Sequence, residues 1–485
     1  MPELLLGLFP ALFDPLAAFP AFPSFLAAAA TAAEPSEAEL GSIVFAGVLL
    51  SLVAIYFAAK LGGELCARIN LPAVLGELVG GVLVGVSALH LVVLPEGAAA
   101  LDPSASVLMS VLEKTAGLTP ESLVPVFQAD SEVLSVLAEL GVVILLFEIG
   151  LESDLKELLR VGPQAAIVAV VGVVVPFAAG TAGLIALFGI ATIPAVFAGA
   201  ALTATSIGIT AKVLAEMQKI SSKEGQIIIG AAVLDDVLGI IVLAVVASLA
   251  QTGDIEITNI IYLIAGAAVF LVGSILIGRL LSDVFVGLVD NMRTRGQVII
   301  ASLSFAFILS YIAAVIQLEA ILGAFAAGLI LAETSKRKEI EEQVAPIADI
   351  LVPVFFVTVG ARTDLSVLNP LEPANREGLI IASFLMVVAI LGKVVTGFTV
   401  FGQEKVNRLA IGVGMVPRGE VGLVFAGVGA ASGVLSESLE AAIIVMVILT
   451  TFLAPPLLRV VFKSEDPSEG GDPAISSAKD VVPEG

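Results

Sequence analysis

The stretch "GAAVLDDVLGIIVLAVVASLA" (230–250) places two adjacent carboxylates, Asp235 and Asp236, in an otherwise apolar segment that is long enough to cross a bilayer. An aspartate at the centre of a spanning helix costs roughly 2.5–3.5 kcal/mol on insertion scales, so such a residue is a candidate functional group. Neighbouring helical residues point about 100° apart, so one aspartate can face a protein partner while the other faces an aqueous cavity. The pair therefore predicts a polar site inside a membrane-spanning helix.

The composition places the chain among polytopic membrane proteins. Hydrophobic residues make up 58% of the 485 residues and charged residues 14%, and the mean hydropathy is +1.08, whereas a soluble domain carries about 25% charged residues. The single cysteine, Cys66, excludes an intrachain disulfide. The net charge of −22 gives no reason to expect a nucleic-acid partner. Much of this charge lies in the N-terminal segment, the 96–135 loop and the tail 464–485, which is expected to be disordered.

Thirteen apolar segments are long enough to span a membrane or nearly so, which predicts an all-α polytopic fold. The ninth and tenth are interrupted by Gly323, Gly328 and Pro353. The preceding segment, 1–42, is apolar and lacks a basic start, so we expect it to be uncleaved or interfacial, with cleavage at "AAAATAA" as the alternative. The thirteen cover about 43–62, 71–95, 131–150, 162–188, 191–217, 225–250, 257–281, 295–316, 319–334, 344–361, 378–401, 406–433 and 438–463.

Basic residues alternate between the connections and so predict the orientation in the membrane. Connections after even-numbered segments contain only Lys114, Arg362 and Arg376. By the positive-inside rule, the other connections and the C-terminus are cytoplasmic and the N-terminus is outside. Both a plasma or inner membrane and an internal membrane fit this pattern. Connections after odd-numbered segments contain Arg68, Lys156, Arg160, Lys219, Lys223, Arg293, Arg295, Lys336, Arg337, Lys338, Lys405, Arg408 and, after the last segment, Lys463.

The sequence also contains an internal repeat. "LLFEIGLESDL" (145–155) and "FFVTVGARTDL" (355–365) share a glycine, an aspartate and a leucine at an offset of 210 residues. They end the third and tenth segments, which are seven segments apart. Because seven is an odd number, the second copy is inverted in the membrane, which gives two six-helix repeats joined by a seventh helix. The same offset places Thr205 in "GAALTATSIGIT" opposite Met415 in "GVGMVPRGEVGL". Paired polar interruptions in inverted halves predict two crossed, broken helices around a transport site.

Three further charged residues are candidates for that site. Lys393 lies in the middle of the eleventh segment, where snorkelling is difficult, so a buried pair with one of the aspartates is expected. Arg418 and Glu420 flank the second interruption and are expected to neutralise each other or the ends of the half-helices. Direct participation in transport is the alternative for these two residues.

Other ionisable residues suggest more ordinary roles. Glu77 in the second segment is expected to serve packing or to face the lipid interface. His90, towards the outer end of the same segment, is expected to be an interfacial histidine, with a pH-sensing role as the alternative.

The chain resembles the NapA-type sodium/proton antiporters of the monovalent cation:proton antiporter superfamily. The resemblance is carried by "TATSIGITAKVL", "GAAVLDDVLGIIVLA", "LGELVGGVLVG" (75–85) and "PRGEVGLVFAG" (417–427), and extends over nearly all of 43–463. It implies that Asp236 carries the cation and the proton, that Asp235 pairs with Lys393 and that Thr205 lies beside the ion. Glu148 departs from the family pattern, in which an apolar residue is more common, and is interpreted as a solvated cavity residue.

The resemblance also implies a homodimer in which each chain has a core domain and a dimerisation domain. The dimerisation domain would contain 43–150 and 293–362, the core domain 151–250 and 363–463, and the linker helix 251–292.

The implied function is secondary active exchange of Na⁺ or Li⁺ for H⁺ by alternating access, with a role in pH homeostasis. A partly desolvated carboxylate lets a proton and Na⁺ compete, so neither a cofactor nor an enzyme activity is required. The sequence contains no G-x-x-x-x-G-K-[ST] loop for ATP. If the Asp235–Lys393 pair opens on cation binding, one Na⁺ displaces two protons and the exchange is electrogenic.

Three alternatives remain open at this point. A K⁺/H⁺ exchanger of the same superfamily usually carries a nucleotide-binding domain where this chain has about twenty residues. An ion channel does not need a buried aspartate–lysine pair. An intramembrane aspartyl protease takes its two aspartates from separate helices, whereas Asp235 and Asp236 are adjacent on one helix.

Overall fold

The computed structural model describes residues 37–94, 103–116, 118–252, 257–371, 373–402 and 406–463. Over these ranges the regular secondary structure is entirely helical. The expected N-terminal segment therefore lies mostly outside the described residues, and the expected tail lies wholly outside them. The α-helices are α3 (Glu37–Arg68), α4 (Ala73–Val84), α5 (Val107–Ala116), α6 (Pro120–Glu152), α7 (Leu155–Phe188), α8 (Thr192–Ala201), α9 (Ile207–Glu216), α10 (Lys223–Thr252), α11 (Ile257–Asn291), α12 (Gln297–Val315), α13 (Ala320–Ala332), α14 (Arg337–Ala361), α15 (Pro373–Gly397), α16 (Arg408–Gly414), α17 (Glu420–Ala431) and α18 (Glu437–Lys463).

These helices confirm the predicted all-α membrane fold. Eight of the described helices are long and apolar enough to cross a membrane, by length and composition. Each of the thirteen predicted segments contains either one helix or a pair of half-helices, the pairs being α8 with α9 and α16 with α17. Two short 3₁₀ helices, η2 (Pro103–Ala105) and η3 (Leu365–Leu368), lie in the connections.

The predicted boundaries of the second and third segments are wrong. The second helix ends at Val84, about ten residues early, because Gly85 adopts an extended ψ of −159° and the N–H of Val86 donates to the carbonyl of Ala361 instead of to a helical partner. His90 therefore lies in the following loop, with a left-handed φ of 53°, and not in the helix. The third helix begins early, at Pro120, because Thr119 and Ser122 form a capping box.

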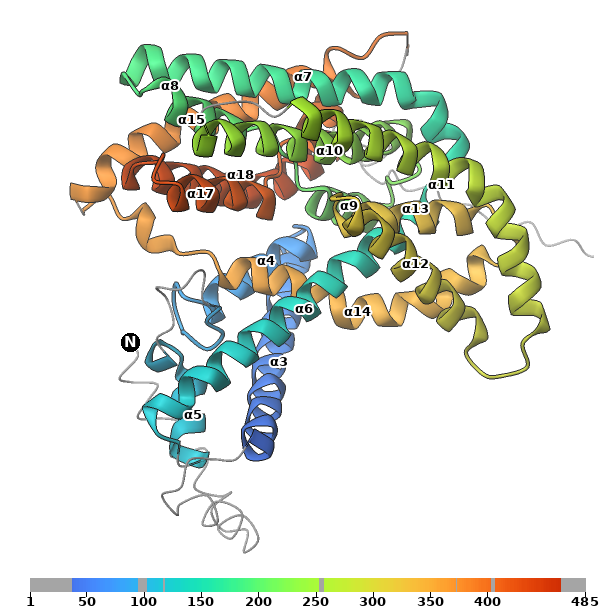
Figure 1. The fold of residues 1–485 in the computed structure, drawn as a ribbon, viewed down its shortest axis with the longest axis horizontal. Coiled ribbons are helices and arrows are strands. Elements are labelled where there is room, and N and C mark those ends of the chain that lie inside the picture. The colour runs from blue at the N-terminus through green and yellow to red at the C-terminus, as the bar shows by residue number, and fades with distance from the viewer. Residues whose placement is uncertain are drawn as a thin grey trace, which may run out of the picture.

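The helices form two groups in Figure 1. Helices α7, α8, α10, α15, α17 and α18 lie together in the upper half of the view, and α3, α4, α6 and α14 lie below them. Helix α11 runs down one side and contacts both α10 and α13. A buried apolar cluster that includes Phe197, Leu385 and Met446 lies within the upper group. A larger cluster extends through the lower group and into α9, α10 and α16.

The internal repeat is visible in the packing. Helix α6 crosses α13 where Gly150 meets Gly328, and α14 crosses α4 where Gly360 meets Gly81. A Cβ at either Gly150 or Gly360 would collide with the facing backbone. The pairs α7 with α10 and α15 with α18 correspond in the same way. Helices seven segments apart therefore occupy equivalent positions, which supports the predicted repeat.

The aspartates of the repeated motif also share one structural role. Asp154 Oδ1 accepts hydrogen bonds from the backbone N–H groups of Lys156 and Glu157 and so caps α7. Asp364 Oδ1 accepts one from the N–H of Ser366 and caps η3. The glycine and the aspartate shared by "EIGLESDL" and "TVGARTDL" thus mark a helix crossing followed by a helix start.

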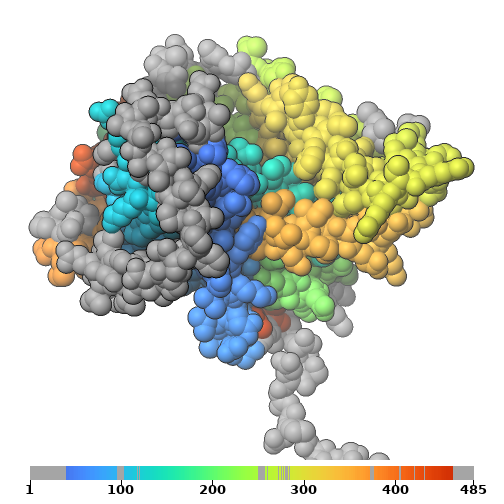
Figure 2. All heavy atoms as spheres, turned by 90° about the horizontal axis from the view of Figure 1, so that it is seen from below, coloured from blue at the N-terminus to red at the C-terminus, as the bar shows by residue number. Residues whose placement is uncertain are grey.

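An apolar stripe on α3 faces outward. Its side chains recur every four residues, so they follow a continuous band that turns slowly around the helix by about 40° at each step, as expected for contact with lipid or another chain. Figure 2 shows α3, α14 and α12 following one another across this side of the molecule. The exposed stripe consists of Phe45, Leu49, Val53, Phe57, Leu61 and Leu65.

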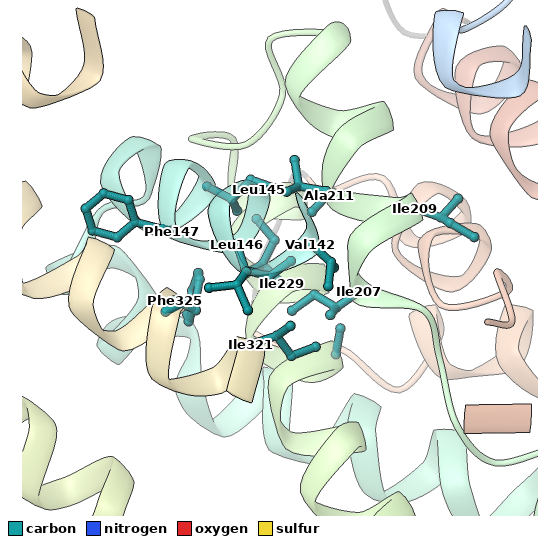
Figure 3. Packing of buried hydrophobic residues seen from close by; sticks show 14 of the residues in the cluster. Val142, Leu145, Leu146, Phe147, Ile207, Ile209, Ala211, Ile229, Ile321 and Phe325 are labelled. Atoms are coloured by element: carbon teal, nitrogen blue, oxygen red, sulfur yellow. The ribbon is translucent and has the colours of Figure 1, made fainter. Parts of the chain in front are cut away.

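Buried apolar side chains fill the space beside the first broken helix. Figure 3 shows Val142 and Leu146 of α6 near Ile207 of α9, with Ile321 and Phe325 of α13 beside them. This seam joins the lower group of helices to the half-helix that follows the break.

Candidate functional site

The two helix interruptions predicted from the sequence lie against each other. Residues 202–206 separate α8 from α9, and residues 415–419 separate α16 from α17. Ser206 N–H donates to the carbonyl of Pro417 over 2.8 Å, and Thr205 Oγ1 donates to the carbonyl of Met415 over 3.1 Å. The residues that the 210-residue offset aligned are therefore hydrogen-bonded to each other. The interruptions leave backbone groups free of helical bonding at the place where the two chain segments meet.

A close approach of Gly419 to the side chain of Ser206 sets the form of the second interruption. Pro417 has no N–H to continue a helix, and Gly419 lies so close to Ser206 that a Cβ would come within 2.8 Å of its Oγ. Thr210, one turn into α9, donates to the carbonyl of Gly414 at the end of α16, over 2.9 Å. Small and hydroxyl-bearing residues therefore hold the two interruptions together.

Arg418 neutralises the end of a half-helix. Its guanidinium is fully buried, and Nη1 donates to the carbonyls of Thr203 and Ala204, just beyond the C-terminus of α8. A cation at this end interacts favourably with the negative end of the helix dipole. This geometry matches the expected neutralisation of a half-helix end. The side chain of Glu420 lies outside the described residues.

Asp235 and Lys393 form a buried ion pair between α10 and α15. Lys393 Nζ lies 3.1 Å from both Oδ1 and Oδ2 of Asp235, and both side chains are 0% exposed. Gly172 of α7 provides space for the lysine, because a Cβ there would lie 3.1 Å from Nζ. The aspartate–lysine pairing expected from the sequence is therefore present. Removing either partner would leave a buried charge without its counter-ion, at a typical cost of about 3–5 kcal/mol.

Asp236 points to a different environment from its neighbour. It is 5% exposed and lines a cavity of about 10 Å³ together with Thr205, Ser206 and Gly419. A cavity of this volume holds about one water-sized particle. The structure thus brings Asp236 and Thr205 together, with Asp235 and Lys393 paired behind them. Glu319, at the start of α13, also lines this cavity. We did not predict that role, because in the sequence Glu319 only marks the start of an apolar segment.

A second, larger cavity lies between α4, α9 and α18. Its volume is about 560 Å³, and Glu77 lines it, in place of the packing or lipid-facing position expected for this residue. Glu148 is half-buried on α6 and interacts electrostatically with Lys212 of α9 and with Glu152. The charged side chains that line the cavity are Glu77, Lys212, Glu216, Lys219 and Arg459.

Glu216 connects α9 to α4. Its carboxylate accepts hydrogen bonds from the backbone N–H groups of Ala73 and Val74, the first two residues of α4. Pro72 precedes them and provides no side-chain cap. A carboxylate from the first broken helix therefore caps a helix of the lower group.

Comparisons with known proteins agree with this architecture. The family described as sodium/hydrogen exchanger, transmembrane, matches residues 48–464. The chain is 68% identical over 445 residues to the high-affinity Na⁺/H⁺ antiporter NhaS3 of Synechocystis sp., covering 92% of this chain and 96% of that protein. It is 32% identical over 417 residues to the Na⁺/H⁺-K⁺ antiporter GerN of Bacillus cereus, covering 85% of this chain and 95% of that protein.

A solved structure shows the same fold. The sodium proton antiporter MjNhaP1 of Methanocaldococcus jannaschii, at pH 8, superposes with a TM-score of 0.56 at 15% identity. The match covers 87% of this chain and 97% of that chain.

Proposed function

The chain belongs to the sodium/hydrogen exchanger family, and we propose that it exchanges Na⁺ for H⁺ across a membrane by alternating access. The observation that carries this proposal is the position of Asp236, which lines a small buried cavity where the two helix interruptions meet. Li⁺ is a second candidate substrate, since carboxylate and carbonyl oxygens suit it equally. K⁺ is the alternative, favoured by the likeness to a relative whose name includes K⁺.

Binding of the cation uses groups at the crossing. Asp236 supplies a carboxylate and Thr205 a hydroxyl, and the interrupted backbone supplies carbonyl oxygens, all of which are ligands for a small hard cation. A proton and Na⁺ compete for the same carboxylate, so loading with one excludes the other. Competition of this kind drives exchange without a resident cofactor or a chemical reaction, and we therefore propose a transporter and not an enzyme.

The Asp235–Lys393 pair supplies a second proton. In the ion-free state Lys393 holds its proton against the carboxylate of Asp235. Cation binding draws Asp235 away, and the buried lysine then loses its proton because burial disfavours its charged form. One Na⁺ thus enters as one proton leaves Asp236 and one leaves Lys393. The exchange moves net charge and is electrogenic.

Movement between the access states requires two rigid parts. We assign 151–250 and 363–463 to a moving core, 43–150 and 293–362 to a static domain, and 251–292 to the linker. The separate apolar cluster around Phe197 and Met446 supports a core that moves as a unit. The glycine contacts of α6 with α13 and of α4 with α14 support a rigid static domain.

The exposed stripe on α3 supports a homodimer built on the static domain, with lipid covering the remaining apolar surface. The alternation of basic residues supports a cytoplasmic C-terminus and an outside N-terminus.

Proteoliposomes that contain an internal pH dye test the proposal. Purified protein should produce a saturable dye response to Na⁺, driven by either gradient, and Asp236→Asn should abolish it while remaining folded. Asp290→Asn, at an exposed surface aspartate, is the matched control and should transport normally. A response to K⁺ alone would establish the alternative substrate. Near-normal exchange by a folded Asp236→Asn protein would exclude this residue as the carrier.

A further inference from the structure

The larger cavity is bordered by a helix of the proposed static domain and by a half-helix of the proposed core. Its lining includes Glu77 of α4, and Lys212 and Glu216 of α9. Leu71 and Lys219 also line it, and they lie in loops that the basic-residue alternation assigns to the cytoplasmic side. A volume of about 560 Å³ is large enough for a monovalent cation that keeps part of its water.

The packing of α4 against α9 orders the charged groups along this cavity. Glu216, at the end of α9, caps the first N–H groups of α4, beginning with Ala73. Residues four apart lie one above the other on a helix. Glu77 therefore lies one turn beyond Ala73 on α4, and Lys212 lies one turn before Glu216 on α9. The second pair is one turn closer to the interruption at 202–206 than the first.

Glu77 has a carboxylate oxygen that the fold does not use. Its Oε2 is buried and accepts no hydrogen bond from the described part of the chain. Glu216 differs, because each of its two oxygens accepts a backbone hydrogen bond. A buried carboxylate oxygen without a partner is costly, so Glu77 gains from a cation that enters the cavity.

Lys212 is a cation shared among several carboxylates. It interacts electrostatically with Glu77 of α4 and with Glu148 and Glu152 of α6. The ion pairs of the described helices do not include Lys212. Lys60 of α3 also acts on Glu77, but its side chain is exposed. Lys212 therefore lowers the negative potential of the cavity without being bound to one partner.

We propose that Glu77 is a transient binding site for a monovalent cation on the cytoplasmic side, and that Lys212 is a tethered cation that competes for it. This inference rests on the proposed function. Among the described residues, the cavity at Glu77 and the cavity at Asp236 share no lining residue, so the two sites are distinct. A carboxylate in a cleft raises the local concentration of cations, and a nearby lysine lowers it. Together Glu77 and Lys212 set how readily cytoplasmic Na⁺ reaches Asp236.

Half-saturating Na⁺ concentrations in everted vesicles, which present the cytoplasmic face, test this proposal. Glu77→Gln should raise the half-saturating concentration roughly threefold, because a carboxylate that gathers cations is lost. Lys212→Met should lower it roughly threefold, because the competing cation is lost. In the double variant, Lys212→Met should have little further effect, since no carboxylate remains at position 77 to be released. Lys212→Arg, which keeps the charge, should behave like the wild type.

Ionic strength separates this electrostatic effect from a packing defect. Raising it with choline chloride from about 0.1 M to about 1 M shortens the Debye length from about 10 Å to about 3 Å. Both shifts in the half-saturating Na⁺ concentration should then shrink, whereas the effect of a packing defect would persist.

Lys156→Met, at an exposed lysine in the first turn of α7, is the matched control and should leave the half-saturating concentration unchanged. The proposal is overturned if Lys212→Met does not lower this concentration, lowers it equally in the Glu77→Gln background, or keeps its full effect in choline chloride. Lys212→Met alone decides the outcome if Glu77→Gln does not fold. Absence of exchange in the wild type would instead overturn the proposed function, so the two failures are distinguishable.

Discussion

The carboxylate of Glu216, at the end of α9, accepts a hydrogen bond from the backbone N–H of Ala73, at the start of α4, over 2.8 Å. A second bond, from the N–H of Val74, is 3.1 Å long. Glu216 and Ala73 are 143 positions apart in the chain, and their bond joins the first broken helix to α4, a helix that the proposed function assigns to the static domain. Motion of the core past α4 has to break these bonds or carry α4 with it.

Replacing Glu216 with alanine should loosen the start of α4. Loss of an N-terminal cap typically costs about 0.5–2 kcal/mol, so backbone amides near Ala73 and Val74 should exchange with deuterium roughly two- to thirtyfold faster. Hydrogen-exchange mass spectrometry of the peptide covering 70–78 measures this. Glu64→Ala removes an exposed glutamate that pairs with Arg68 on the same helix and is the control. Unchanged exchange in Glu216→Ala would show that the cap does not hold α4.

Lys393 should determine the voltage dependence of transport. In wild-type proteoliposomes, a potential imposed with K⁺ and valinomycin should change the Na⁺/H⁺ exchange rate, provided that K⁺ is not a substrate. Lys393→Ala should weaken this dependence more than it weakens Na⁺ binding, because the proton held beside Asp235 is lost. Lys336→Ala, at a surface ion pair, should behave like the wild type. If voltage leaves the wild-type rate and equilibrium point unchanged, the pair is a structural salt bridge.

The repeated glycines should be intolerant of a methyl group. Gly150→Ala and Gly360→Ala each force a Cβ into the facing backbone, so each should lower stability by about 1–3 kcal/mol. Gly162→Ala in α7 meets nothing within 4 Å and should be neutral or stabilising, because alanine favours helix. Thermal unfolding of the detergent-solubilised protein compares the three. Equal melting temperatures would contradict the close helix contacts.

The orientation can be tested with two introduced cysteines in a Cys66→Ser background. Ser104→Cys and Ser335→Cys occupy exposed positions in connections that the basic residues assign to opposite sides. An impermeant thiol reagent should label Ser104→Cys from outside intact cells and Ser335→Cys only in everted vesicles. Labelling of both from the same side would exclude the odd number of spanning segments between them.

The sequence predicted those features that depend on local pattern. Apolar length located the segments, the 210-residue offset paired Thr205 with Met415, and the scarcity of buried cations identified Lys393 as the partner of an aspartate. These signals suffice because polar groups inside a membrane are costly and therefore rare.

Contacts between segments that are distant in the chain could not be predicted from the sequence. The start of α6 was missed because polar residues such as Asp130 interrupt its apolar pattern. The early end of α4 depends on Ala361, and the cap at Ala73 depends on Glu216. Glu319 lines the same cavity as Asp236 because the start of α13 lies close to Asp236 in the folded protein. None of these partners is close in the sequence, and none shares a motif.

The buried guanidinium of Arg418 gives the crossing a permanent positive charge. With Asp236 ionised and Asp235 paired to Lys393, the four side chains sum to zero. In the proposed two-proton exchange, Na⁺ replaces the proton of Lys393, so the sodium-loaded core is again neutral, whereas the proton-loaded core carries one positive charge. A membrane potential exerts about 2.3 kcal/mol per charge per 100 mV. In this scheme the electric field therefore acts on the step in which the proton-loaded core moves across the membrane. The step in which the sodium-loaded core moves is independent of voltage.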